Sequence, residues 1–152
     1  PNNIQVISVL ALIHESQKEY EISDSLYTSA LKIDSSNVLI MNNFAYSLAE
    51  RGIRLQDALT MSKKTVDAEP KNSSYLDTIG WIYFRLGEFK KAKKNIEEAV
   101  KLENKNATLL DHLGDVYFKL GEKSKAVDLW KNAFELDPTK NDIKTKIEKG
   151  EL

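Results

Sequence analysis

Apolar and small residues recur along most of the chain at intervals of three and four positions, the spacing of one face of an α-helix. The pattern is clearest at residues 76–83, stops at Gly87, and resumes at residues 89–100. It predicts short helices joined in pairs by tight turns. The predicted helices are 4–17, 20–33, 38–50, 55–68, 73–86, 89–102, 107–120 and 123–136. Residues 140–149 place Ile143 and Ile147 on one face and lysines elsewhere, which predicts a capping helix with a polar outer side.

The paired pattern is an internal repeat. The segment Tyr75–Glu88 recurs as Leu109–Glu122, and Gly80 corresponds to Gly114, an offset of 114 − 80 = 34 residues. The same phase divides the chain into repeats at about 4–37, 38–72, 73–106 and 107–138, with one extra residue in the second. The first repeat is the most divergent, because Lys18 stands where the later repeats have a turn glycine.

The repeat resembles a known family. Its fourth copy shows the pattern of the tetratricopeptide repeat at Leu110, Leu113–Gly114, Tyr117, Ala126, Ala133 and Pro138. The resemblance covers nearly the whole chain and implies an all-α, right-handed superhelical solenoid of four helix pairs plus the C-terminal cap. The stretch 42–52 and its counterparts are similar to the C-terminal repeats of large bacterial members. Some of those relatives are outer-membrane lipoproteins that act as protease adaptors.

Composition narrows the classes of function. The 152 residues include 22 Lys and Arg against 23 Asp and Glu, so the near-neutral chain has no general affinity for nucleic acid or an acidic membrane surface. Cysteine is absent, which excludes disulfides, thiolate metal sites and cysteine nucleophiles. No apolar run reaches the roughly 18 residues of a membrane span. Pro1 falls in phase with the repeat, so we expect a fragment of a longer array, from either the bacterial cytoplasm or the periplasm.

The resemblance also implies a binding surface, because the first helix of each repeat lines the concave face of such an array. Side chains at equivalent positions are then expected to face a protein partner or an extended peptide. The candidates are Asn42, Tyr46, Glu50, Asp77, Trp81, Phe84, Arg85, Asp111, Asp115, Phe118 and Lys119. Carboxylates outnumber basic groups among the first-helix candidates, so the face is predicted to be acidic and to favour a segment with basic and apolar residues.

Two alternatives stay open for these candidates. Trp81, Phe84 and Phe118 either anchor a partner or pack inside the array, because their helices are apolar nearly all round. Asp77 and Asp111 either meet a partner or form hydrogen bonds within the array. The carboxylate clamp of chaperone-binding relatives is broken, since Asp77 and Trp81 stand where basic residues are required.

No motif indicates an enzyme, a cofactor or a metal site. His14 and His112 lie in different repeats and read as ordinary histidines, and the lysines at 90–94 have glutamates nearby, which indicates a solvated face. We therefore predict a non-catalytic adaptor or scaffold. The alternatives are a structural spacer, a solenoid that self-assembles through its N-terminal end into a homo-oligomer, and regulatory repeats of a larger bacterial protein such as a lipoprotein protease adaptor.

Overall fold

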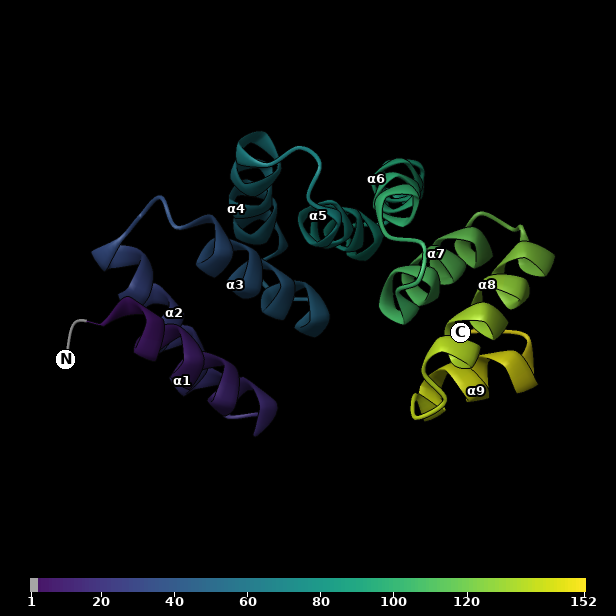
Figure 1. Ribbon diagram of the computed structural model, residues 1–152, viewed down its shortest axis with the longest axis horizontal. Coiled ribbons are helices and arrows are strands. Elements are labelled where there is room, and N and C mark those ends of the chain that lie inside the picture. The colour runs from purple at the N-terminus through teal and green to yellow at the C-terminus, as the bar shows by residue number, and fades with distance from the viewer. Residues whose placement is uncertain (1–2) are drawn as a thin grey trace. The chain divides into compact units, whose positions relative to one another are not determined.

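Nine helices and no strand make up the regular structure of residues 3–152, the part of the chain that the computed structural model describes (Figure 1). The helices are α1 Ile4–Ser16, α2 Tyr20–Ile33, α3 Val38–Arg51, α4 Leu55–Ala68, α5 Ser73–Arg85, α6 Phe89–Leu102, α7 Ala107–Lys119, α8 Lys123–Leu136 and α9 Asn141–Lys149. The prediction of an all-α fold of helix pairs with a C-terminal capping helix is confirmed. Pro1 and Asn2, predicted to close an upstream repeat, lie outside the described residues.

An asparagine begins the first helix of every pair. Asn3, Asn37, Asn72 and Asn106 each accept a hydrogen bond through the side-chain oxygen from backbone N–H groups in the first turn of the helix. These N–H groups have no partner within the helix, so each asparagine cap stabilises its helix by about 1 kcal/mol. The repeat spacing therefore fixes where each pair begins.

The turn inside a pair needs a left-handed backbone. Gly87 and Gly121 adopt φ values of 78° and 84°, which glycine reaches without steric cost. Lys18 occupies the equivalent turn between α1 and α2 at φ 61°. The divergent first repeat therefore keeps the turn geometry although it lacks the glycine.

Close approach of the two helices explains the glycines inside α5 and α7. A β-carbon on Gly80 would lie 2.4 Å from Cγ1 of Ile96, and one on Gly114 would lie 2.5 Å from Nε1 of Trp130. Neither distance is compatible with van der Waals contact. The second helix can therefore place a bulky side chain directly against the backbone of the first.

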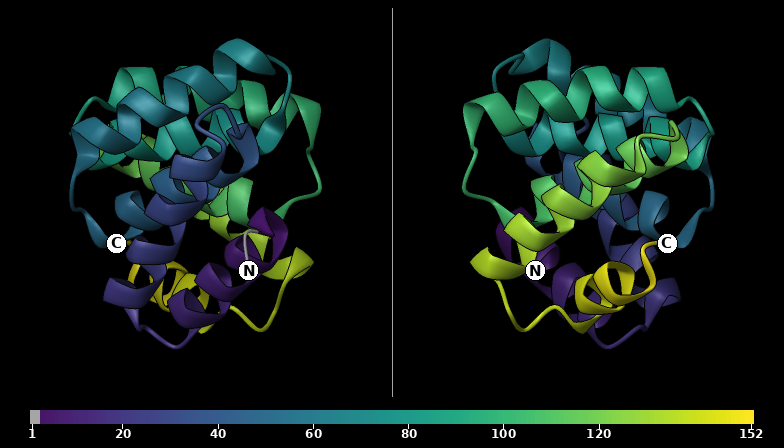
Figure 2. Two further views of the ribbon diagram at one scale, coloured as in Figure 1. Left: turned by 90° about the vertical axis from the view of Figure 1, so that its left-hand side faces the viewer. Right: turned by 90° about the vertical axis from the view of Figure 1, so that its right-hand side faces the viewer.

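The helices form two compact units, with the boundary after Ala68. In the first unit α1 pairs with α2 and α3 with α4, and α2 meets α3 where the rings of Tyr27 and Phe44 stack at 5.2 Å. In the second unit α5 pairs with α6 and α7 with α8, α6 packs on α7, and α9 lies against α8 (Figure 2). The sequence predicts one continuous array across both units, and this stays a prediction.

The helices are also short. None in residues 3–152 is long and apolar enough to cross a membrane.

Candidate partner-binding surface

The candidate residues differ widely in exposure. Five are buried, namely Asn42, Asp77, Trp81, Asp111 and Asp115. Three aromatic residues, Tyr46, Phe84 and Phe118, are partly exposed. Three charged residues near the C-terminal ends of α3, α5 and α7 are exposed: Glu50, Arg85 and Lys119. The structure thus divides the set into an inner polar group and an outer group with aromatic and charged side chains.

Asp77 on α5 is paired with a histidine of the next repeat. Nδ1 of His112 on α7 lies 2.9 Å from both carboxylate oxygens, and both side chains are less than a tenth exposed. Burial alone lowers the pKa of His112, but the charge of Asp77 and its hydrogen bond outweigh burial, so the net pKa is raised. When His112 is protonated, it therefore forms a buried ion pair with Asp77 between neighbouring first helices.

Asp111 and Asp115 on α7 share one lysine of the capping helix. Nζ of Lys146 lies 2.9 Å from Oδ1 of Asp111 and 2.7 Å from Oδ1 of Asp115. The same Asp115 oxygen also accepts a hydrogen bond of 2.9 Å from Nε1 of Trp130. Burial raises the pKa of Asp115 to about 6, although Lys146 opposes the shift. The capping helix thus brings the counter-charge that the last repeat lacks.

A stack of three rings fills the space beside the Asp77–His112 pair. The ring of Trp81 lies 4.7 Å from that of Phe84 and 4.1 Å from that of His112, and both contacts are nearly parallel. Trp81 itself is only 8% exposed. It is covered within the protein, whereas Phe84 at the end of the stack stays partly exposed.

These contacts correct the expected acidity of the face. Asp77 and Asp111 follow the second of their two alternatives, contacts within the protein, and Asp115, a candidate for the partner, is likewise buried and paired inside the second unit. The physical reason is the cost of burying a carboxylate without a counter-charge. A spacing signal for both pairs is present in the sequence, since His112 follows Asp77 and Lys146 follows Asp111 by 35 residues, one repeat plus one position.

Within residues 3–152 no group of three or more histidine and carboxylate side chains is placed to hold a metal ion. His14 lies 2.5 Å from Glu19 through Nδ1, so both histidines have acidic partners.

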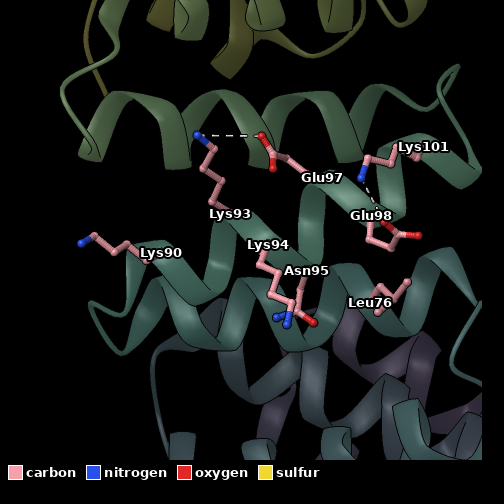
Figure 3. A pocket seen from close by; sticks show the side chains of 8 residues that line it. All are labelled: Leu76, Lys90, Lys93, Lys94, Asn95, Glu97, Glu98 and Lys101. Carbon is pink, nitrogen blue, oxygen red and sulfur yellow. Dashed lines mark hydrogen bonds and ion pairs between the residues drawn. The ribbon is translucent and has the colours of Figure 1, made fainter.

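The lysines of α6 line a shallow hollow together with Leu76 of α5 (Figure 3). Glutamates of the same helix are interleaved with its lysines: Lys93 lies 3.9 Å from Glu97, and Lys101 lies 3.2 Å from Glu98. Lys91 pairs with Glu88. This mixture of charges supports the reading of a solvated face.

Comparison with known proteins extends these observations. Residues 52–136 match the family model described as anaphase-promoting complex, cyclosome, subunit 3. The TPR repeat-containing protein PA4667 of Pseudomonas aeruginosa is 21% identical over 101 residues, which cover 66% of this chain and 17% of the relative. This chain therefore spans about a sixth of the length of that curated relative.

Two solved structures share the fold. The crystal structure of MamA protein matches with a TM-score of 0.71 and 20% identity over 97% of this chain and 80% of its own. The first TPR of Spaghetti (RPAP3), bound to the HSP90 peptide SRMEEVD, matches with a TM-score of 0.68 and 23% identity over 77% of this chain and 92% of its own. At these identities the likeness concerns the fold.

Proposed function

The chain belongs to the tetratricopeptide repeat family, whose repeats are non-catalytic protein–protein interaction modules, and from this premise we propose that it is an adaptor or scaffold holding a segment of another protein. The contact that we assign to the second unit is the α5–α7 surface, defined as Phe84, Arg85, Phe118 and Lys119. In the first unit Ala49 and Glu50 of α3 occupy the equivalent positions, and the partly exposed Tyr46 is equivalent to Trp81.

The observation that supports this assignment is the pairing of the inner carboxylates. Because Asp77, Asp111 and Asp115 are buried and paired within the protein, the charges that remain exposed on α5 and α7 are those of Arg85 and Lys119. Among residues 3–152 no carboxylate forms an ion pair with either side chain. Phe84 and Phe118 lie one position before these cations and supply partly exposed apolar area. Aromatic and arginine side chains are enriched at protein–protein interfaces.

This arrangement changes the partner that we propose. The sequence predicted a basic segment, whereas free cations beside aromatic rings favour a segment with acidic and apolar residues. The peptide SRMEEVD bound to the RPAP3 neighbour is acidic too. That peptide is nevertheless expected to bind poorly here, because Asp77 and Trp81 stand in place of two clamp residues.

A peptide array tests the proposal. The probes are 15-residue peptides in acidic, neutral and basic series with matched apolar content, and SRMEEVD is included as a separate peptide. The wild-type chain should retain acidic peptides, and the double variant Arg85→Glu, Lys119→Glu should lose them. The matched control, Lys90→Glu with Lys94→Glu, makes the same change of charge on exposed α6 residues and should bind like the wild type.

Two outcomes would overturn the assignment. Equal loss in both double variants would show a general effect of net charge, and preferential capture of basic peptides would restore the acidic face predicted from the sequence. Self-assembly through the N-terminal end, and a regulatory role in a larger bacterial protein, stay predictions.

A further inference from the structure

An open groove lies between the second helices of the first unit. It has a volume of about 410 Å³ and is lined by α2 on one side and by α4 on the other. Phe44 of α3 forms the floor, and the half-buried side chains of Leu31 and Met61 form apolar walls. The ring of Tyr27 stacks on Phe44 at 5.2 Å and holds the floor in place. Phe44 and Tyr46 are two positions apart on α3 and point to opposite sides of the helix, so the groove is not part of the first-helix surface.

The turn before α4 reverses a charge that the other helix pairs share. The residue directly before the second helix is Glu19, Glu88 or Glu122 in the other three pairs, whereas Arg54 stands before α4. A carboxylate is favoured at the N-terminus of a helix, and a cation is disfavoured there. Arg54 also has a φ of 48°, in the left-handed region that a side chain disfavours. Local structure therefore does not explain this arginine, which is a reason to seek a function for its side chain.

The Arg54 side chain lies over the groove. Its guanidinium carbon is 5.5 Å from the centre of the Phe44 ring, and the side chain is 51% exposed. Nε donates a hydrogen bond of 2.9 Å to Oδ2 of Asp57. The two terminal nitrogens have no acceptor within residues 3–152, so they are available to a ligand in the groove.

In the second unit the corresponding side chain is tied to the neighbouring second helix. Glu122, the equivalent of Arg54, lies 3.5 Å from Lys93 of α6. The first-unit equivalent of Lys93 is Asp24 of α2, but Arg51 holds this carboxylate at 2.6 Å. Arg54 is therefore not drawn to α2 and keeps its place at the edge of the groove.

We propose that this α2–α4 groove binds a peptide segment of a partner protein in which an aliphatic side chain is flanked by carboxylates. The groove is defined as Leu31, Lys32, Phe44, Arg54, Asp57 and Met61. The aliphatic side chain packs between the apolar walls, and a carboxylate accepts hydrogen bonds from the terminal nitrogens of Arg54. Lys32, which is exposed, supplies the second cation, so two cations face one carboxylate in the lining.

The size of the groove fits side chains of a peptide. Sites for small ligands occupy about 300–1,000 Å³, and this groove lies at the lower end of that range. The groove belongs to the first unit, whereas the α5–α7 surface belongs to the second. The proposal therefore gives the chain a second contact for a partner, separate from the first.

Methionine methyl NMR of the intact chain reads this groove directly. The chain has 2 methionines, of which Met61 lines the groove, whereas Met41 is buried and lies outside the lining. The probe is the acetylated and amidated peptide Gly-Ser-Glu-Leu-Glu-Ser-Gly. Its titration should shift the Met61 methyl signal along a saturable curve, with a Kd on the order of 0.1–1 mM, and leave the Met41 signal in place. Replacing the leucine of the peptide by serine, or both glutamates by glutamine, should weaken binding in each case.

A charge reversal at the edge of the groove tests the role of Arg54. Arg54→Glu introduces the residue type of the other three pairs and should weaken binding of the Glu-Leu-Glu peptide roughly tenfold or more, because a carboxylate then faces the ligand. Lys63→Glu is the matched control. It makes the same change of charge on an exposed α4 residue outside the groove, so the affinity should stay within about twofold of the wild type.

Four outcomes would overturn the proposal. They are a Met61 signal that does not move, equal loss of affinity in the Arg54 and Lys63 variants, equal binding of the glutamine peptide, and a shift of Met41 as large as that of Met61. The double variant Arg85→Glu, Lys119→Glu should keep the Met61 shift. Loss of the shift in that variant would place the peptide on the α5–α7 surface and would also overturn the groove assignment.

Discussion

Removal of the Lys146 ammonium should strongly destabilise the second unit. Its ammonium lies 2.9 Å from Asp111 and 2.7 Å from Asp115, and its side chain is 17% exposed. Lys146→Met keeps most of the aliphatic stem and removes the ammonium that bonds to both carboxylates. Two largely buried acids then lose their counter-charge.

The magnitude follows from burial. Removing one partner of a buried ion pair costs about 3–5 kcal/mol, whereas a surface pair contributes about 0–1 kcal/mol. Because Lys146 keeps some contact with solvent, we expect about 3 kcal/mol at pH 8. The pKa of Asp115 is already raised to about 6 by burial, against the attraction of Lys146, and loss of the lysine raises this pKa further. Asp115 is therefore protonated at pH 5, and the cost there should be clearly smaller.

Urea unfolding followed by tryptophan fluorescence measures this cost selectively. The chain has 2 tryptophans, and both Trp81 and Trp130 lie in the second unit. Lys144→Met is the control, because Lys144 is 57% exposed and 3.8 Å from Glu148, so its loss should cost less than about 0.5 kcal/mol. Equal destabilisation by the two variants at pH 8, or a Lys146→Met cost that does not fall at pH 5, would refute the reasoning.

Three more predictions follow from single features. Gly114→Ala should destabilise the second unit by about 1–3 kcal/mol in the same urea assay, because the new β-carbon would lie 2.5 Å from Nε1 of the fully buried Trp130; an unchanged midpoint would contradict this. Lys18→Gly should stabilise the α1–α2 pair by up to about 1 kcal/mol by relieving a positive φ, seen as slower amide hydrogen exchange, whereas Lys18→Ala should give little gain. Stability of the second unit should fall as pH rises from about 5 to 8. Because the pKa of His112 is raised in the folded protein, the stability that His112 contributes is complete below pH 6.5, its ordinary pKa, and is lost once the pH exceeds its pKa in the folded protein. Because the pKa of Asp115 is raised to about 6, ionisation of this buried carboxyl lowers the stability as the pH rises towards 6 and above. When urea midpoints are measured over this pH range, His112→Gln should remove the decline in stability above pH 6.5. If the midpoint of this variant falls with pH as steeply as that of the wild type, other groups are responsible.

The sequence by itself determined the helices and their order. Apolar spacing, the asparagine caps and the turn glycines act within a few residues, and the 34-residue repetition reinforces each signal. The predicted helices therefore agree with the structure to within one residue at every end. The divergent first repeat folds alike because Lys18 adopts the geometry of the missing glycine.

The tertiary structure alone decided the chemistry of the surface. Whether Asp77 meets a partner or His112 depends on a side chain 35 residues away, and the charge of Asp111 and Asp115 depends on the capping helix. Trp81 is covered because His112 of the next repeat and Phe84 stack on it. Helical periodicity places a residue on a face, but it does not specify the counter-charge that the neighbouring helix brings to that face. Because a buried carboxylate requires such a counter-charge, packing between repeats settled which charges stay free for a partner.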